Sequence, residues 1–139
     1  MCGAKWYFAS LGPKYHFGPH INHEMKILFV EDNVNAARAA KVLLELRGYT
    51  VDIAESLVKA RDCLGTNSYD LLISDIRLPD GTGYDLLSHP RRPPRAIALS
   101  GYTSHSDRSE ALSKGFTEFV TKPFRTEELI AAIERVGIV

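Results

Sequence analysis

The stretch 71–83 reads Leu-Leu-Ile-Ser-Asp-Ile-Arg-Leu-Pro-Asp-Gly-Thr-Gly and decides the fold. Its apolar first part predicts a buried strand that ends in a single carboxylate, Asp75. Pro79, Gly81 and Gly83 then predict a loop. An acid between a strand and a loop lies at the carboxyl edge of a sheet, where open α/β sheets bind their ligands. A single acid at a strand end is more often only solvated. A functional site therefore requires suitable side chains at the other strand ends as well.

Short apolar runs alternate with helical patterns along the rest of the chain. Because Pro90, Pro93 and Pro94 restrict what can follow the central loop, the third helix is expected to be short. Strand and helix alternate five times, which predicts a doubly wound α/β fold with a parallel sheet and helices on both faces. The predicted strands are 26–30, 50–54, 70–74, 96–100 and 116–120, and the short third helix is 84–88.

The composition is that of an ordinary globular domain. The chain has 139 residues, of which 45% are hydrophobic and 24% charged, and 17 basic residues balance 17 acidic ones. This balance gives no electrostatic footprint for nucleic acid or for an anionic membrane, so we expect neither as a partner. No apolar run approaches the roughly 20 residues of a membrane span, and no secretory signal is evident. We therefore expect a cytoplasmic protein, with Cys2 and Cys63 as free thiols.

The segment 1–24 differs from the domain predicted for residues 25–139. Its aromatic residues stand among glycines and prolines without a helical or strand period, so we interpret it as a tail, the remnant of a neighbouring module, or a start placed upstream of Met25. Three histidines and one cysteine in it could ligate a metal ion, but their spacing matches no closed structural site, and an incidental His-rich tail is favoured. These four residues are Cys2, His16, His20 and His23.

Functional side chains follow three other predicted strands. Glu31 and Asp32 follow the first strand, Ser100 ends the fourth, and Lys122 comes just after the fifth. In a parallel sheet these positions meet Asp75 at one edge. Three crowded acids hold a cation, and oxygen ligands without His or Cys favour Mg²⁺. A lysine and a hydroxyl suit phosphate oxygens, so the acid is a plausible phosphoryl acceptor. The alternative for the acid pair is that it serves a helix dipole.

Four segments at these strand ends resemble the receiver domain of two-component response regulators. The resemblance covers Met25 to about Val136 and implies the flavodoxin-like strand order 2-1-3-4-5. Each segment is weak alone, but four in order on the expected strand ends are specific. They are Val30-Glu31-Asp32-Asn33, Ser74 to Gly83 around Asp75, Ala98-Leu99-Ser100-Gly101, and Thr121-Lys122-Pro123-Phe124.

The resemblance implies roles for the site residues. Asp75 is expected to take a phosphoryl group from a phosphohistidine on a sensor histidine kinase or a histidine phosphotransfer protein. Asp32 is expected to bind Mg²⁺ (or Mn²⁺) directly, Glu31 mainly through a water, and Arg77 through its backbone carbonyl, with Asp75 itself a ligand. Lys122 is expected to pair with Asp75 and later with the phosphoryl group.

The resemblance also implies a switch that a downstream effector protein reads. Ser100 is expected to contact the phosphoryl group, and Phe119 to turn inward as Ser100 moves. The Lys122–Pro123 bond is expected to be cis. Such a domain catalyses its own phosphorylation and slow autodephosphorylation without being a conventional enzyme. Ser100 stands where Thr is more common and Phe119 where Tyr is also common, and Arg77 is expected to tune the lifetime of the phosphoryl group.

Alternative functions remain open from the sequence. A small-molecule phosphatase with an aspartyl phosphate typically has a second acid two residues after the nucleophile, where this chain has Arg77. A degenerate receiver that acts only as a protein-interaction module is disfavoured by the complete set of site residues. No output domain follows, which we interpret as a stand-alone receiver or a receiver of a hybrid histidine kinase.

Overall fold

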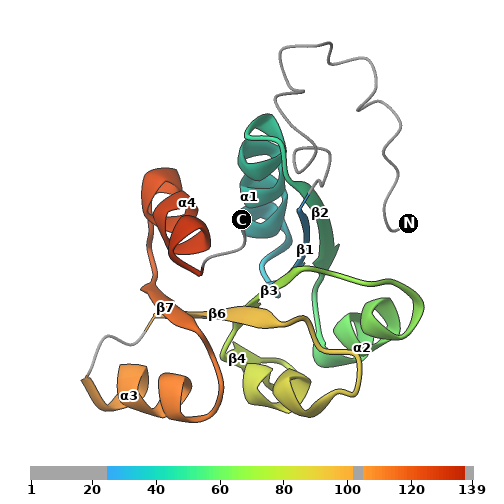
Figure 1. Ribbon diagram of the computed structural model, residues 1–139, viewed down its shortest axis with the longest axis vertical. Coiled ribbons are helices and arrows are strands. Elements are labelled where there is room, and N and C mark those ends of the chain that lie inside the picture. The colour runs from blue at the N-terminus through green and yellow to red at the C-terminus, as the bar shows by residue number, and fades with distance from the viewer. Residues whose placement is uncertain (1–24, 102–104, 137–139) are drawn as a thin grey trace.

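The structure, a computed structural model, describes residues 25–101 and 105–136. Its centre is a five-stranded parallel sheet with the order β2-β1-β3-β6-β7 (Figure 1). This order confirms the predicted flavodoxin-like topology. The strands are β1 (Lys26–Val30), β2 (Thr50–Ala54), β3 (Leu71–Asp75), β6 (Arg95–Ser100) and β7 (Glu118–Thr121).

Helices cover both faces of the sheet, as the doubly wound pattern predicts. On one face lie α1 (Val34–Leu46) and α4 (Thr126–Arg135). On the other lie α2 (Leu57–Thr66), the 3-10 helix η4 (Gly83–Ser88) and α3 (His105–Ser113). None of the helices in the described ranges is long and apolar enough to cross a membrane.

The sheet separates two apolar cores. Successive side chains of a strand point to opposite faces, so Ile27 and Phe29 of β1 pack beneath α1 and α4. Leu28 and Val30 of the same strand pack beneath α2 and α3. All four side chains are at most 1% exposed. The central strands are therefore apolar on both faces, which explains their near-continuous hydrophobic sequence.

The third helix is shortened to η4, in agreement with the proline-rich sequence after it. The loop that replaces the missing turns is fastened by arginines. Arg91 donates from Nε to the carbonyl oxygen of Leu64 at 2.8 Å, and Arg92 donates from Nη1 to the carbonyl oxygen of Leu87 at 2.9 Å. Charge-assisted bonds to backbone carbonyls thus hold the loop where a longer helix would supply its own hydrogen bonds.

Three strands differ in position from the prediction, and of these the fourth only begins one residue earlier, at Arg95. The third strand runs one residue later, so Asp75 is its last residue and not the residue after it. The predicted start of the fifth strand was wrong, because Phe116 closes the turn that follows α3. Its N–H donates to the carbonyl oxygen of Ala111 at 3.0 Å, and its side chain is buried in the core. The pairing with β6 therefore begins only at Glu118.

Candidate functional site

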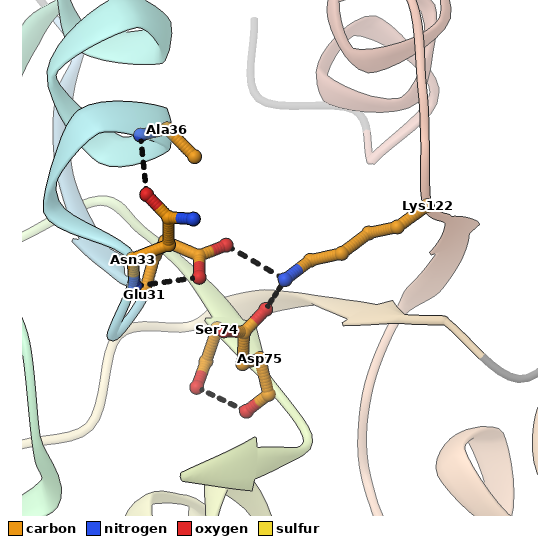
Figure 2. Close-up of polar contacts among 6 residues, drawn as sticks. All are labelled: Glu31, Asn33, Ala36, Ser74, Asp75 and Lys122. Carbon is orange, nitrogen blue, oxygen red and sulfur yellow. Dashed lines mark hydrogen bonds and ion pairs between the residues drawn. The ribbon is translucent and has the colours of Figure 1, made fainter.

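The end of β1 places the first part of the site. Glu31 and Asp32 follow the strand directly, and Asn33 caps α1 by accepting a hydrogen bond from the Ala36 N–H at 3.0 Å (Figure 2). Glu31 is buried, and its Oε2 accepts from the Asn33 N–H at 3.0 Å. Asp32 is exposed. The cap thus fixes the turn that aims Glu31 at the sheet edge while Asp32 faces solvent.

The central strand places Asp75. This residue ends β3 between β1 and β6 and is 4% exposed. The hydroxyl of Ser74 donates to the carbonyl oxygen of Asp75 at 2.8 Å. Gly83 lies against the same carbonyl, and its N–H donates to the Ile76 carbonyl oxygen at 2.8 Å. The backbone around the acid is therefore held from both sides of the loop.

Lys122 joins the two buried acids. Its Nζ lies 2.7 Å from Oε1 of Glu31 and 2.6 Å from Oδ1 of Asp75 (Figure 2). Its backbone N–H donates to the Ser100 carbonyl oxygen at 2.8 Å, which ties the start of the loop to β6. The Lys122–Pro123 peptide bond is cis, as the resemblance implies. One ammonium group thus bridges two carboxylates that lie at the ends of two neighbouring strands, β1 and β3.

The three acids also form a candidate cation site. One carboxylate oxygen from each of Glu31, Asp32 and Asp75 lies within 4.8 Å of the others. Within the part of the chain that the structure describes, no other three His, Cys, Asp or Glu side chains come as close. This all-oxygen set, with two buried members and one open to solvent, fits a hard divalent cation such as Mg²⁺. Cys2, His16, His20 and His23 lie outside the described residues.

Burial and pairing set the charges of these groups. Burial, reinforced by neighbouring Glu31, raises the pKa of Asp75 to about 7, although the Lys122 ammonium opposes the rise. Burial also opposes ionisation of Glu31, but its contacts with Lys122 and the Asn33 N–H outweigh burial and lower its pKa. Burial disfavours the ammonium of Lys122, yet the two carboxylates outweigh it and raise its pKa. Of these two neighbouring acids, Asp75 therefore takes up a proton more readily than Glu31 as the pH falls.

The other predicted residues surround the same edge. A cavity of about 110 Å³ is bordered by Asp32, Asp75, Arg77, Ser100 and Lys122. Its size suits a small group such as a phosphoryl group or a water molecule. The structure brings these five residues together, as the sequence predicts.

Phe119 stands apart from that cavity. It is 3% exposed and packs in the core beneath α3. The guanidinium of Arg108 lies 5.1 Å from the centre of its ring, within the range of a cation–π contact. Phe119 thus already lies inward in this structure, and its predicted turn as Ser100 moves stays a prediction. Arg108 is a neighbour that the sequence pattern did not single out.

Sequence reasoning also missed a small hairpin that supports the loop after Asp75. β4 (Arg77–Leu78) pairs with β5 (Gly81–Thr82), and Asp80 at its turn caps α2. The Asp80 carboxylate accepts from the Leu57 N–H at 2.9 Å and the Val58 N–H at 3.1 Å, and these bonds lower its pKa. The Pro-Asp-Gly triplet signalled the turn, but nothing local signalled its distant partner.

Removal of the bridging ammonium is expected to destabilise the protein in a pH-dependent way. Lys122→Met leaves Glu31 and Asp75 buried and adjacent, which we expect to cost roughly 1–3 kcal/mol at pH 8. The folded-state pKa values of both acids then rise, so the folded protein binds protons that the unfolded chain releases, and the loss shrinks towards pH 5. Urea unfolding at both pH values measures the difference.

Lys59→Met is the matched control, because Lys59 pairs with Glu55 at 3.4 Å on the surface and its side chain is 62% exposed. Its effect should stay within about 0.5 kcal/mol at both pH values. An equal loss for Lys122→Met at pH 5 and pH 8 would contradict the bridging role.

The strand order and this edge together define a class of protein. A flavodoxin-like sheet with an acidic cluster and a paired lysine at its carboxyl edge is a CheY-like α/β domain. The family model of the response regulator receiver domain matches residues 27–134. The chain therefore belongs to the response regulator receiver domain family.

Individual relatives agree with this membership. The chain is 32% identical over 117 residues to an uncharacterized 14.6 kDa protein of Leptolyngbya boryana, covering 81% of this chain and 89% of that protein. It is 34% identical over 112 residues to the transcriptional regulatory protein DltR of Streptococcus agalactiae, covering 78% of this chain and only 50% of DltR. The expectation that no nucleic acid is involved gains no support from a relative of this kind.

A solved structure shows the same fold in a modified state. A response regulator protein from Burkholderia pseudomallei with a phosphorylated aspartic acid, calcium ion and citrate is similar to the chain with a TM-score of 0.72 and 26% identity. The similarity covers 78% of this chain and 66% of that one. Family membership implies phosphoryl acceptance in general terms.

Proposed function

We propose that this chain is a phosphoryl-accepting switch in a two-component phosphorelay, with residues 25–139 as the receiver unit. The observation that carries the proposal is the buried carboxylate of Asp75 beside the ammonium of Lys122 and two further acids at one sheet edge. The proposed phosphoryl donor is a phosphohistidine on a sensor histidine kinase or a phosphotransfer protein. A downstream effector protein reads the modified state, and the protein acts in the cytoplasm.

The transfer step conserves atoms and electrons. An oxygen of the Asp75 carboxylate forms a bond to phosphorus, and the bond from phosphorus to the imidazole nitrogen of the donor breaks. That nitrogen keeps the electron pair, and the product is an acyl phosphate on Asp75. Water later attacks phosphorus, which releases inorganic phosphate and restores the carboxylate.

The neighbours of Asp75 stabilise the charge of the transferred group. Lys122 would turn from the carboxylates to a phosphoryl oxygen, and the Ser100 hydroxyl would donate to another. Asp32, Glu31, Asp75 and the backbone carbonyl of Arg77 would hold Mg²⁺ or Mn²⁺. When bound, such an ion neutralises negative charge on the phosphoryl oxygens. Positioning and charge neutralisation supply most of the catalysis in this class of reaction.

The switch itself would work through Ser100 and Phe119. A phosphoryl group on Asp75 adds negative charge beside β6, and a shift of Ser100 towards it would open space on its far side. The ring of Phe119 lies buried beneath α3 and would adjust to that space. The surface of α3 and β7 would then carry the signal to a partner.

Magnesium-dependent self-phosphorylation is the test of the proposal. We expect incubation with acetyl phosphate and Mg²⁺ to add the mass of one phosphoryl group, measured on the intact protein. With excess EDTA in place of Mg²⁺ we expect uptake to slow by a factor on the order of 100. A parallel assay with p-nitrophenyl phosphate should show no sustained turnover. Sustained turnover would favour a phosphatase, and the absence of uptake from acetyl phosphate and from phosphorylated phosphotransfer proteins would favour an interaction module.

A further inference from the structure

A groove between α1 and α4 borders the site at Glu31 and Lys122 and extends along α1 beyond it. It forms a cavity of about 520 Å³ beside the site. Ala39 and Leu43 of α1 form one wall, Phe124 and Leu129 the opposite wall, and Phe29 of β1 lies at the base. The cavity has the size of pockets that enclose a sizeable organic ligand, and most of the residues that line it are apolar.

The groove is open because α1 presents small side chains along it. Ala36 and Ala39 are exposed, one turn apart, and leave room that larger residues would fill. Leu43, on the same face one turn further, is 41% exposed although it borders the apolar cavity. An apolar side chain that is partly exposed beside a cavity can bury more of its surface when another apolar group binds there.

The residue just before β1 lies in the same layer of the molecule as the groove. Met25 precedes β1, and its carbonyl oxygen accepts from the Thr50 N–H at 2.9 Å. Its side chain packs against the core that lies beneath α1 and α4, which also contains Phe29 and Leu129 of the groove. Met25, which follows the segment 1–24, therefore lies on the same side of the sheet as the groove, at the amino edge of the sheet.

The length and chemistry of this segment match the groove. α1 has 13 residues and is about 20 Å long, whereas an extended chain covers roughly 3.3 Å per residue. A few extended residues thus reach along the helix. The segment carries the side chains Trp6, Tyr7, Phe8, Tyr15 and Phe17 and only one acid, Glu24. Its glycines and prolines disfavour a regular element of its own, so its aromatic side chains need a surface elsewhere.

We propose that the segment 1–24 docks in the groove between α1 and α4, with the aromatic run Trp6-Tyr7-Phe8 seated against Leu43 and Phe124. The groove ends at Glu31 and Lys122, so the docked segment lies beside the loop that carries Lys122. Docking is a property of the resting protein, and the proposal goes beyond phosphoryl transfer without depending on it.

Trp6 supplies the test, because it is the single tryptophan of the full chain. In the wild type we expect blue-shifted Trp6 emission and protection from acrylamide quenching. Leu43→Glu places a charge in the groove at an exposed position and should shift the emission to longer wavelength and remove the protection. Ala39→Glu, also exposed, should do the same. Far-UV circular dichroism checks that each variant is folded.

Val58→Glu is the matched control, because Val58 is 58% exposed on α2, across the sheet from the groove. Its emission should equal that of the wild type. Water-exposed emission in the wild type, or emission that Leu43→Glu and Ala39→Glu leave unchanged, would overturn the proposal. Blue-shifted emission that appears only at high protein concentration, together with a dimer in sedimentation, would also overturn it in favour of a second copy of the chain.

Discussion

Asp75→Asn is expected to take up no phosphoryl group and to be more stable than the wild type at pH 8. The loss of uptake follows because an amide oxygen is a poor nucleophile and no other acid occupies its position at the end of β3. The remaining acids of the site belong to the loop after β1. We therefore expect the mass of the intact variant to stay unchanged in acetyl phosphate and Mg²⁺.

The gain in stability follows from the cost of burying the acid. The pKa of Asp75 is about 7 in the folded protein, against 3.8 for an ordinary aspartate. Between these values the folded state binds a proton that the unfolded chain does not, so the stability of the wild type falls as the pH rises through this window. Asparagine lacks this penalty, and Lys122 keeps its contact with Glu31. We expect a gain on the order of 1–3 kcal/mol at pH 8 and a smaller one at pH 5.

Urea unfolding at pH 5 and pH 8 measures this difference, and intact mass measures uptake. Asp62→Asn is the control, since it makes the same change of charge at an exposed position of α2. It should take up one phosphoryl group and leave the stability nearly unchanged. Uptake by Asp75→Asn would assign the acceptor to another residue, and a loss of stability at pH 8 would show that Asp75 stabilises the fold in its charged form.

Gly83→Ala is expected to lower the free energy of unfolding by about 2–3 kcal/mol and to impair uptake. A methyl group at Gly83 would overlap the carbonyl oxygen of Asp75 and lie 2.8 Å from Oγ of Ser74. One of these neighbours is backbone, so it cannot rotate away. Gly83 does not have a positive φ, and the cost is therefore steric and not conformational. The shift falls on the acceptor itself, so the rate of uptake should fall with the stability.

Gly65→Ala gives the opposite outcome and is the matched control. A methyl group at Gly65 meets nothing within 4 Å, and the residue lies inside α2. Alanine should therefore stabilise the protein by about 0.5–1 kcal/mol without changing uptake. Thermal unfolding and intact mass compare both variants with the wild type. If Gly83→Ala behaved like Gly65→Ala, the close approach of the loop to Asp75 would have no energetic consequence.

The sequence predicted what depends on chain order and periodicity. The apolar runs located β1 and β2 at their observed bounds, and the strand ends brought Glu31, Asp75 and Lys122 to one edge. It could not predict what depends on contacts between distant residues. The Asp80 cap on α2 joins residues 22 to 23 positions apart, and no local pattern signals such a pair.

The same limit explains the error at the fifth strand. Phe116 and Phe119 look alike in an apolar run, and a period of two does not show where a helix ends. The hydrogen bond from the Phe116 N–H to the Ala111 carbonyl oxygen closes the end of the helix and keeps Phe116 out of the strand. This bond forms only once the helix end is folded. The sequence likewise could not predict that Lys122 contacts two carboxylates. The resemblance implied one partner, Asp75, whereas the folded protein also places Glu31 beside the ammonium group.

Because the two cores lie on opposite faces of the sheet, the packing of one core can change separately from the packing of the other. Side chains beneath α1 and α4 do not belong to the cluster beneath α2 and α3, although both stand on the same strands. Substitutions in different cores should therefore add in their effects on stability. One small sheet can thus carry two surfaces that diverge separately in evolution, one for each set of helices.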